Sequence, residues 1–264
     1  MYALVTGASS GIGAEFASQL AKQGKDLILV ARRQARLASL ANELKQAYNV
    51  DVVVYTQDLS LPEAAQTLYE WVQEHGYAID LLVNNAGFGL VGAVQELSAD
   101  KQESMLLLNM VCLQVLTRLF VADFLTKNEP AGIINVASTA AFQAVPYMAT
   151  YAATKAFVLH FTEALAAELR DTKVHVMALC PGLTATEFQQ TAGMASGQSV
   201  KAEMTPKDVV QAGLSAYRRR QVVVIPGLFN KVLAAFVKWV PRRVLRYFSA
   251  RLVKKTLLDA GGTS

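Results

Sequence analysis

Seven short runs of apolar, largely β-branched residues recur along this chain, and segments of helical length separate most of them. The runs are Ala3–Val5, Leu27–Val30, Val52–Tyr55, Leu81–Val83, Ile133–Val136, Val174–Leu179 and Val222–Ile225. The helical segments include Ala14–Lys22, Arg33–Ala47, Glu63–Glu74, Tyr151–Arg170 and Pro206–Arg219. Strands that alternate with helices form parallel sheets covered by helices on both faces. The alternation therefore predicts an α/β fold with a doubly wound, seven-stranded parallel sheet.

The chain is expected to form one domain followed by a distinct tail. No linker rich in Pro, Gly or Ser interrupts it before Pro226, so we assign residues 1–226 to the domain and 227–264 to a basic amphipathic helical extension. Of the 25 Lys and Arg residues, eight lie between Leu228 and Ser264, together with only one of the 21 acidic residues. The stretch Gly182–Gln198 lies between a strand and a helix and has the length of a functional or mobile loop.

Cysteine usage and apolar patterning bear on the compartment. Cys112 and Cys180 are the only cysteines, and both lie in apolar runs without metal-ligand spacing. This pattern is typical of a reducing, cytoplasmic environment, and we expect no metal site. No charged segment precedes the first apolar run, and no uninterrupted apolar run reaches about 18 residues. We therefore expect neither a secretory signal nor a membrane span.

A glycine-rich loop, TGASSGIG, joins the first strand to the first helix. Gly7, Gly11 and Gly13 allow a sharp turn and a close approach of the backbone to a phosphate. The helix that follows offers free N–H groups and a partial positive charge to that anion. This context indicates a Rossmann-like dinucleotide site, whereas a tight turn without a ligand is the alternative.

The second strand ends in LILVARR, which bears on the choice of dinucleotide. Ala31 stands where NAD-binding proteins place an acid that accepts hydrogen bonds from the ribose 2′-OH. Arg32 and Arg33 follow, and guanidinium groups pair well with a 2′-phosphate. We therefore favour NADP(H) over NAD(H), with Arg32 as the stronger candidate. The alternative is that both arginines, and Arg33 in particular, begin the next helix in solvent.

The loop pattern TG-x-x-x-G-x-G resembles that of the single-domain branch of the short-chain dehydrogenase/reductase family. Further motifs follow in the family's order: NNAG at residues 84–87, Asn109, Ser138, Tyr151 and Lys155 in YAATK, and a PG-x-T-x-T motif that begins at Pro181. Each motif alone is a weak signal, but the ordered set over residues 2–225 is specific.

The resemblance implies a catalytic set of Asn109, Ser138, Tyr151 and Lys155. Tyr151 would be the general acid/base, since an ammonium one helical turn away favours the phenolate of a group whose ordinary pKa is about 10. Lys155 would also bind the nicotinamide ribose, Ser138 the substrate oxygen, and Asn109 a water that links Lys155 to solvent. The alternatives are a strand-end cap for Ser138, a buried amide tying two strands together for Asn109, and a chance helical pair for Tyr151 and Lys155.

Loop chemistry and the resemblance together predict a larger set of cofactor-binding residues. Asp58 resembles the family's adenine-contacting aspartate, although it could instead be a cap or turn residue before Pro62. The predicted set is Gly7, Ser9, Ser10, Gly11, Ile12, Gly13, Arg32, Arg33, Asp58, Leu59, Asn85, Ala86, Gly87, Tyr151, Lys155, Pro181, Gly182, Thr184 and Thr186.

The predicted substrate pocket is apolar. Its residues are Ser138, Ala140, Phe142, Val145, Tyr151 and Phe188, with Phe88, Tyr147 and Met194 as further lining candidates. The set holds no clamp for a phosphate or carboxylate, which favours a lipophilic ketone, aldehyde or 3-oxoacyl thioester. Core packing is the alternative for Phe142 and Phe188. His75, His160 and His175 are expected to be structural or exposed.

The sequence thus predicts an NADP(H)-dependent carbonyl reductase or alcohol dehydrogenase. The alternative is a non-catalytic NADP(H)-binding redox sensor or scaffold, for which the complete catalytic set would have no use. The resemblance also implies a homodimer or homotetramer formed through helices at about 99–127 and 150–171.

The tail is predicted to form two amphipathic helices separated by Pro241. Apolar residues recur at helical spacing on both sides of it, and most of the arginines lie on another face. Residues 228–255 suit either a helix pair in a membrane interface or one packed on the body or a second subunit, and the second reading is slightly favoured. The apolar stripe argues against nucleic acid binding. The apolar positions are Phe229, Val232, Leu233, Phe236, Trp239, Val240, Val244, Leu245, Phe248 and Leu252.

Overall fold

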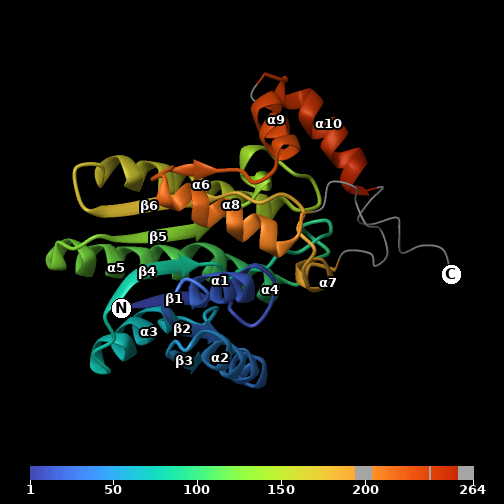
Figure 1. The fold of residues 1–264 in the computed structure, drawn as a ribbon. Helices are drawn as coiled ribbons and strands as arrows, with labels where there is room; N and C mark the ends of the chain where they lie inside the picture. The colour runs from blue at the N-terminus through green and yellow to red at the C-terminus, as the bar shows by residue number, and fades with distance from the viewer. Residues whose placement is uncertain (194–203, 238, 255–264) are drawn as a thin grey trace.

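One parallel sheet of seven strands forms the centre of the computed structural model, which describes residues 1–193, 204–237 and 239–254 (Figure 1). The strands lie in the order β3-β2-β1-β4-β5-β6-β7, and every pairing is parallel. The predicted doubly wound sheet is thereby confirmed. The strands are β1 (Tyr2–Thr6), β2 (Asp26–Ala31), β3 (Val52–Thr56), β4 (Ile79–Asn84), β5 (Ala131–Val136), β6 (Val174–Leu179) and β7 (Val223–Val224).

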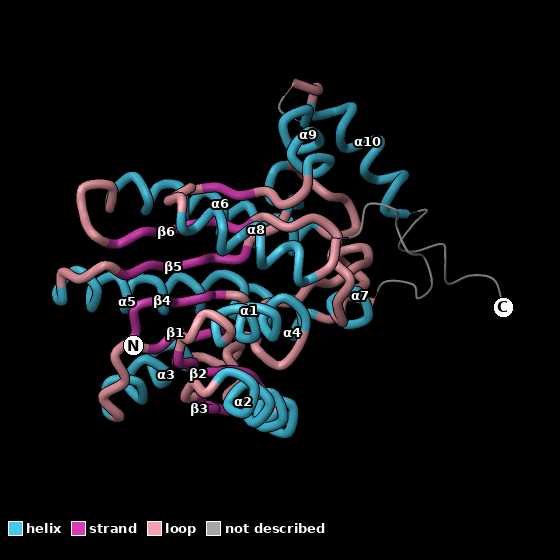
Figure 2. Tube along the Cα trace, viewed as in Figure 1, coloured by secondary structure: helices cyan, strands magenta, loops and turns pink. Residues whose placement is uncertain are grey.

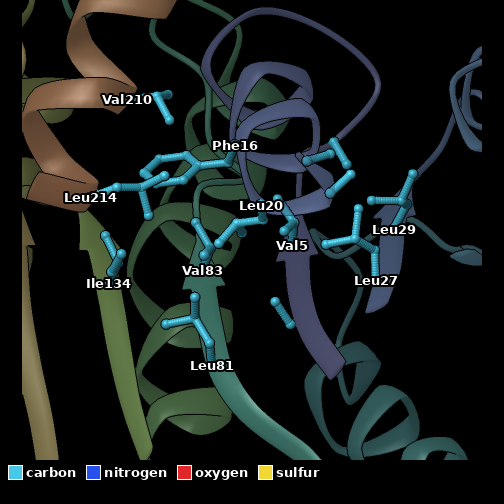
Figure 3. Packing of buried hydrophobic residues seen from close by; sticks show 14 of the residues in the cluster. Val5, Phe16, Leu20, Leu27, Leu29, Leu81, Val83, Ile134, Val210 and Leu214 are labelled. Atoms are coloured by element: carbon cyan, nitrogen blue, oxygen red, sulfur yellow. The ribbon is translucent and has the colours of Figure 1, made fainter. Parts of the chain in front are cut away.

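Successive residues of the central strands point to opposite faces, and each face has its own apolar core. Ala3 and Val5 of β1 are buried in one core, whereas Leu4 between them is buried in the other. Figure 3 shows the first core, in which Phe16 and Leu214 join strand residues such as Val83. Because both faces of the strands are buried, these strands appear in the sequence as continuous apolar runs.

Helices cover both faces of the sheet, as the tube drawing also shows (Figure 2). The first core lies under α1 (Gly11–Ala21), α2 (Gln34–Tyr48) and α8 (Pro206–Arg218). The second lies under α3 (Ala64–Glu74), α5 (Leu113–Lys127) and the end of α6 (Ala149–Glu168). All five helices expected from the sequence are present, with ends shifted by a few residues. Thr205 caps α8, since its hydroxyl accepts a hydrogen bond from the Asp208 backbone N–H.

The long continuous helix before β5 contains an irregular π-helical turn that the sequence does not predict. This helix consists of α4 (Ala99–Leu106), a π-helical segment η1 (Leu107–Cys112) and α5. A π segment widens a helix locally and is common at functional sites. Ala99–Lys127 is also the one described helix long and apolar enough to cross a membrane, by length and composition only. In this fold α5 packs on the sheet and buries residues such as Phe120 and Phe124.

A buried polar network links the two central strands to the helices behind them. The Asn84 amide donates hydrogen bonds to Asn135 Oδ1 at 2.9 Å and to Thr117 Oγ1 at 3.0 Å. The Asn135 amide donates in turn to Thr162 Oγ1 at 3.0 Å. All four side chains are at most 3% exposed. The network thus joins β4 and β5 to α5 and α6.

The predicted loop after β6 contains a short helix, α7 (Phe188–Thr191), while residues 194–198 of it, Met194 included, lie outside the described residues. Thr184 pairs with Met204 in an isolated parallel bridge. The two tail helices expected around Pro241 are present as α9 (Leu228–Val237) and α10 (Arg242–Val253). They stand beyond the sheet at one corner of the molecule (Figure 1).

Candidate active site

The glycine loop follows β1 and is held by the loop that follows the neighbouring strand β4. The Thr6 hydroxyl accepts hydrogen bonds from the backbone N–H groups of Asn85 and Ala86, both at 3.0 Å. The Asn85 amide donates to the carbonyl groups of Thr6 and Gly7. Thr6, which sequence reasoning did not single out, therefore connects the two loops. These hydrogen bonds hold NNAG against TGASSGIG.

The glycines of this loop lie so close to neighbouring atoms that a side chain at these positions would clash with them. Gly7 and Gly11 have φ angles of +66° and +56°, a region that favours glycine. A Cβ at Gly7 would lie 2.8 Å from the Asn85 amide nitrogen, and one at Gly11 would lie 2.9 Å from Thr186 Cγ2. No side chain caps the first turn of α1, so its N–H groups are available to an anion. The loop thus fits the phosphates of a dinucleotide.

Thr186 reaches the glycine loop from the PG-x-T-x-T motif, and the rest of that motif packs on the tail. A Cβ at Gly182 would lie 2.6 Å from the amide atoms of Asn230 in α9. Thr184 is buried, and its hydroxyl donates to the Gly182 carbonyl at 3.0 Å. The Pro181 carbonyl accepts a hydrogen bond from the Thr139 N–H at 2.9 Å. Asn230 was not predicted, because no sequence signal relates α9 to this motif.

Arg33, rather than Arg32, contacts the glycine loop. The Arg33 guanidinium donates to Ser9 Oγ at 3.0 and 3.1 Å and to Ser10 Oγ at 2.7 Å. Arg32 lies farther out and makes a 3.5 Å contact with Asp58. This geometry reverses the order of the two arginines suggested by the sequence. Arg33 is the N-cap residue of α2, and its side chain remains exposed while it contacts the two serines of the loop.

Asp58 and Leu59 follow β3 on the same side of the site. Leu59 is buried, and Asp58 Oδ1 accepts hydrogen bonds from the backbone N–H and the hydroxyl of Ser60. The turn role considered for Asp58 therefore accounts for one of its oxygens, while the other faces Arg32.

Glu187 joins this arginine-rich corner to the segment after β6. Its carboxylate accepts a hydrogen bond from Arg33 at 2.6 Å and another from Arg36. These two guanidinium groups lower the pKa of Glu187 to about 2. Sequence reasoning missed Glu187 and Arg36, which are separated by 151 positions. A cleft of about 530 Å³ opens beside them, lined in part by Ser10, Gly11 and Thr186, but its lining includes neither Ser138 nor Tyr151.

The predicted catalytic tyrosine and lysine lie on the buried side of α6. Tyr151 is 8% exposed and Lys155 is 5% exposed. The Lys155 ammonium lies 5.9 Å from the centre of the Tyr151 ring and donates a hydrogen bond of 2.8 Å to the Val136 carbonyl at the end of β5. The pair is therefore no chance surface arrangement, since both polar ends are held inside the protein.

Burial dominates the acid–base properties of both groups. It raises the pKa of Tyr151 to about 12, and a hydrogen bond from Ser138 acts in the opposite direction without overcoming it. Burial also lowers the pKa of Lys155 to about 8. The protein groups alone thus keep the phenol protonated at neutral pH. From the sequence we expected the Lys155 ammonium to lower the pKa of Tyr151, but the effect of burial is larger. A protonated phenol is the form that can give a proton to a carbonyl oxygen.

Ser138 lies at the carboxyl end of β5 and begins the short 3₁₀ helix η2 (Thr139–Phe142). Its hydroxyl accepts a hydrogen bond of 3.1 Å from the Ala140 N–H, as expected of the capping role. The same hydroxyl acts on the Tyr151 phenol, since it lowers the pKa of that group. Capping and a position beside the phenol are therefore compatible, because an oxygen that accepts the cap can still donate its own proton.

Asn109 lies in the π segment and ties a loop to α6, not two strands to each other. Its amide donates to the Phe88 carbonyl at 2.9 Å and to Thr154 Oγ1 at 3.1 Å, and its oxygen accepts from the Phe88 N–H at 3.2 Å. Thr154, which was not predicted, donates to the Tyr151 carbonyl at 2.7 Å. A Cβ on Gly87 would lie 2.9 Å from Asn109 Oδ1 and 3.5 Å from Lys155 Nζ. Glycine at position 87 therefore keeps the space between the two side chains open.

An apolar cluster surrounds the Tyr151 ring and includes most of the predicted substrate residues. The Phe188 ring lies 5.3 Å from the Tyr151 ring, and Val145 is buried in the same cluster. Ala140, Phe88 and Tyr147 pack at its border. Val253, from the end of α10, also belongs to it.

Phe142 does not share this cluster. It packs with Phe157, Phe161 and Ile225 around another core, so the core-packing alternative is correct for this residue. Its position follows from η2, which turns the chain between Ala140 and Phe142. The three histidines also lie elsewhere: His75 packs against Trp71, His160 lies near Glu163, and His175 packs against Tyr217.

Comparison with known proteins gives a consistent picture. Residues 1–196 match the family model of the short chain dehydrogenases. The chain is 35% identical over 232 residues to an NADP-dependent 3-hydroxy acid dehydrogenase of Schizosaccharomyces pombe, which covers 84% of this chain and 88% of the relative. It is 32% identical over 266 residues to a very-long-chain 3-oxoacyl-CoA reductase of Neurospora crassa, covering 98% of this chain and 78% of that protein.

A solved structure shows the same arrangement. A short-chain dehydrogenase from Sphingobium yanoikuyae in complex with NADPH is 34% identical and superimposes with a TM-score of 0.81. The match covers 86% of this chain and 88% of the other.

Proposed function

Because this chain belongs to the short-chain dehydrogenase family and is an oxidoreductase, we propose that it transfers hydride between NADP(H) and a lipophilic carbonyl compound or its alcohol. The observation that carries the proposal is the buried Tyr151–Lys155 pair near Ser138, with the Tyr151 ring inside an apolar cluster. A phenol, an ammonium and a hydroxyl together are what the reduction of a carbonyl group needs at its oxygen.

Tyr151 is the proton donor in the direction of reduction. Its pKa of about 12 keeps the proton on the phenol until a base develops next to it. A carbonyl carbon that gains a hydride leaves a negative oxygen, and that oxygen takes the phenolic proton. Ser138 donates a hydrogen bond to the same oxygen and stabilises the charge as it forms. Oxidation of an alcohol follows the same steps in reverse.

Lys155 stabilises the phenolate that Tyr151 becomes after it gives up its proton. The ammonium is charged below about pH 8 and lies within the same buried region, where the effective dielectric is low. Asn109 and Thr154 act as positioning residues. Together they hold the loop at Phe88 against α6, and this sets the distance between that loop and Tyr151.

The cofactor proposal rests on the charges around the glycine loop. NADP(H), when bound, supplies or accepts the hydride. The N-terminus of α1 and the glycines would hold its pyrophosphate, and Arg33 with Ser9 and Ser10 would hold the 2′-phosphate. Lys155 would hold the nicotinamide ribose. The names of the Schizosaccharomyces pombe relative and of the Sphingobium yanoikuyae structure support the phosphorylated dinucleotide.

A lipophilic substrate is supported by the residues around Tyr151. Val145, Met148, Phe188 and their neighbours form an apolar cluster, and Lys155 is the one buried Lys or Arg among the described residues. The cluster would therefore not hold a phosphate or a sugar acid. An aliphatic or polycyclic group would replace water against these side chains, which is favourable in proportion to the apolar area buried. The substrate named in the Neurospora crassa relative has such a chain.

The decisive experiment compares Tyr151→Phe with the wild type. NADPH oxidation is followed against a 3-oxoacyl thioester, a steroid ketone, a long-chain aldehyde and a quinone. The variant should lose turnover and keep NADPH binding, because only the hydroxyl is removed. Tyr69→Phe, on the far helix α3, is the matched control and should keep full activity. Full activity of Tyr151→Phe would overturn the mechanism, and tight NADPH binding by a wild type inactive on every substrate would favour the sensor alternative.

A further inference from the structure

The outward face of α9 is apolar and uncovered within the described structure. The helix buries Asn230, Ala234 and Val237 against the body. Its opposite side presents five large apolar side chains to solvent, and the turn that follows presents Trp239 at 86% exposure. The five, with their exposed fractions, are Leu228 (79%), Phe229 (64%), Val232 (60%), Leu233 (45%) and Phe236 (61%). We call these five residues and Trp239 the α9 face.

Basic residues accompany the α9 face in the sequence and on the neighbouring helix α10. Between residues 228 and 254 the sequence holds seven Lys and Arg residues and no Asp or Glu. Arg242, Arg243 and Arg246 are exposed on the neighbouring helix α10. Arg251 also remains on the surface, where its guanidinium lies 4.3 Å from the centre of the Tyr247 ring. This surface combines apolar side chains with positive charges and no negative ones. A complementary partner is therefore both apolar and negatively charged.

The other two candidate occupants fit less well. The body already occupies the inner side of the helix pair, through Asn230 on Gly182 and Val253 beside Tyr151, so it cannot also cover the outer side. A second copy docked by two-fold symmetry would bring the same patch against itself, because such interfaces are self-complementary. The cations of residues 228–254 of both copies would then meet, with no Asp or Glu in that stretch to balance them.

We propose that the α9 face and the cations of α10 bind the surface of an anionic lipid bilayer. The apolar side chains enter the boundary between headgroups and acyl chains, and the cations contact the headgroups. Trp239 lies in this boundary, a position that tryptophan favours. The α9 face and the cations of α10 thus form a docking surface for a membrane, on the side of α9 that faces away from Gly182.

The docking surface adjoins the substrate side of the molecule. Val253, at the end of α10, packs in the same cluster as Tyr151, Phe188 and Ala192. Bilayer docking would therefore place the apolar cluster close to the lipid phase. This last step rests on the proposed function, whereas the docking itself does not.

The test uses the full-length protein and phospholipid vesicles. Binding is measured by flotation with phosphatidylcholine vesicles, with and without phosphatidylserine, at low and high salt. We expect binding that needs phosphatidylserine, weakens as salt rises, and shifts Trp239 fluorescence to shorter wavelength in a Trp71→Phe background. Absence of binding to the phosphatidylserine vesicles would overturn the proposal, as would equal binding to phosphatidylcholine alone.

Variants separate the apolar and electrostatic contributions. Phe229→Asp with Phe236→Asp should abolish vesicle binding, and Arg242→Ala, Arg243→Ala and Arg246→Ala combined should weaken it about a hundredfold. Leu61→Asp, at an equally exposed apolar position elsewhere, is the control and should bind as the wild type does. Turnover of a water-soluble carbonyl should stay unchanged in all of them, so loss of catalysis and loss of docking are distinguishable. An oligomer that dissociates in the double Asp variant, without vesicle binding by the wild type, would assign the surface to a second copy.

Discussion

The Arg33 guanidinium donates a hydrogen bond of 2.6 Å to the Glu187 carboxylate and so joins the loop after β2 to the segment after β6. The same guanidinium also contacts Ser9 and Ser10, the hydroxyls that we assign to the 2′-phosphate. With a pKa lowered to about 2, Glu187 is negative at every physiological pH. The carboxylate and a 2′-phosphate would therefore compete for one cation.

Replacing Glu187 by Gln should strengthen NADP(H) binding and leave NAD(H) binding unchanged. The substitution removes a negative charge beside the phosphate position and keeps the size of the side chain. An exposed ion pair contributes up to about 1 kcal/mol, so the affinity for NADPH should rise by roughly two- to fivefold. Titration of NADPH and NADH by fluorescence at low salt measures both. Glu43→Gln, on the exposed side of α2, is the control, and an equal gain for NADH would contradict the competition.

Arg33→Ala should weaken NADPH binding more than Arg32→Ala does. Arg33 reaches both serine hydroxyls, whereas Arg32 is turned toward Asp58. Hydrogen bonds to charged groups contribute about 1.5–3 kcal/mol, which corresponds to roughly a ten- to hundredfold loss for Arg33→Ala. Calorimetry with NADPH and NADH tests the order. A larger effect of Arg32→Ala would restore the ranking that the sequence suggested.

The rate of carbonyl reduction should fall as pH rises through about 8. Burial lowers the pKa of Lys155 to about 8, so the ammonium is present below that pH and is lost above it. Tyr151, with a pKa of about 12, stays protonated over the same range and does not cause the decline. The pH profile of kcat/KM reports groups of the free enzyme and is the measurement to make. Constant kcat/KM up to about pH 10, the usual pKa range of lysine, would contradict this assignment.

Thr154→Val should destabilise the protein and slow turnover, while Thr154→Ser should largely restore both. Valine keeps the shape but leaves the buried Asn109 amide without the acceptor at 3.1 Å. An unsatisfied buried donor costs about 1–3 kcal/mol in the free energy of unfolding. Urea denaturation gives the stability, and kcat gives the effect on positioning. If Val and Ser behave alike in kcat, Thr154 has only a packing role.

Much of the fold could be predicted because the strands are buried on both faces. Continuous apolar runs such as Leu27–Val30 and Val174–Leu179 mark central strands, and motif order fixed where the glycine loop and the Tyr151–Lys155 pair would lie. Residues that act from within one strand–helix unit, such as Ser138 after β5, are accessible to this kind of reasoning.

Contacts between distant segments were not accessible. Glu187 and Arg33 are 154 positions apart, and neither residue type nor spacing pairs them. The π segment around Asn109 has no recognised sequence pattern, since a single widened turn changes the apolar period very little. Phe142 was misassigned because it follows Ala140 by only two positions, yet the 3₁₀ helix turns the chain between them and places Phe142 at another core.

The buried amides of Asn84 and Asn135 have a consequence for how the chain finds its fold. Shifting β5 by one residue against β4 would turn each side chain to the opposite face. Asn135 would then lose its hydrogen bonds to Asn84 and Thr162, and each buried polar group left without a partner costs about 1–3 kcal/mol. These hydrogen bonds add little to the stability of the native sheet, but their loss strongly destabilises a misaligned sheet. The network therefore favours the correct alignment of the strands. It disfavours misaligned intermediates during folding more than it stabilises the native protein.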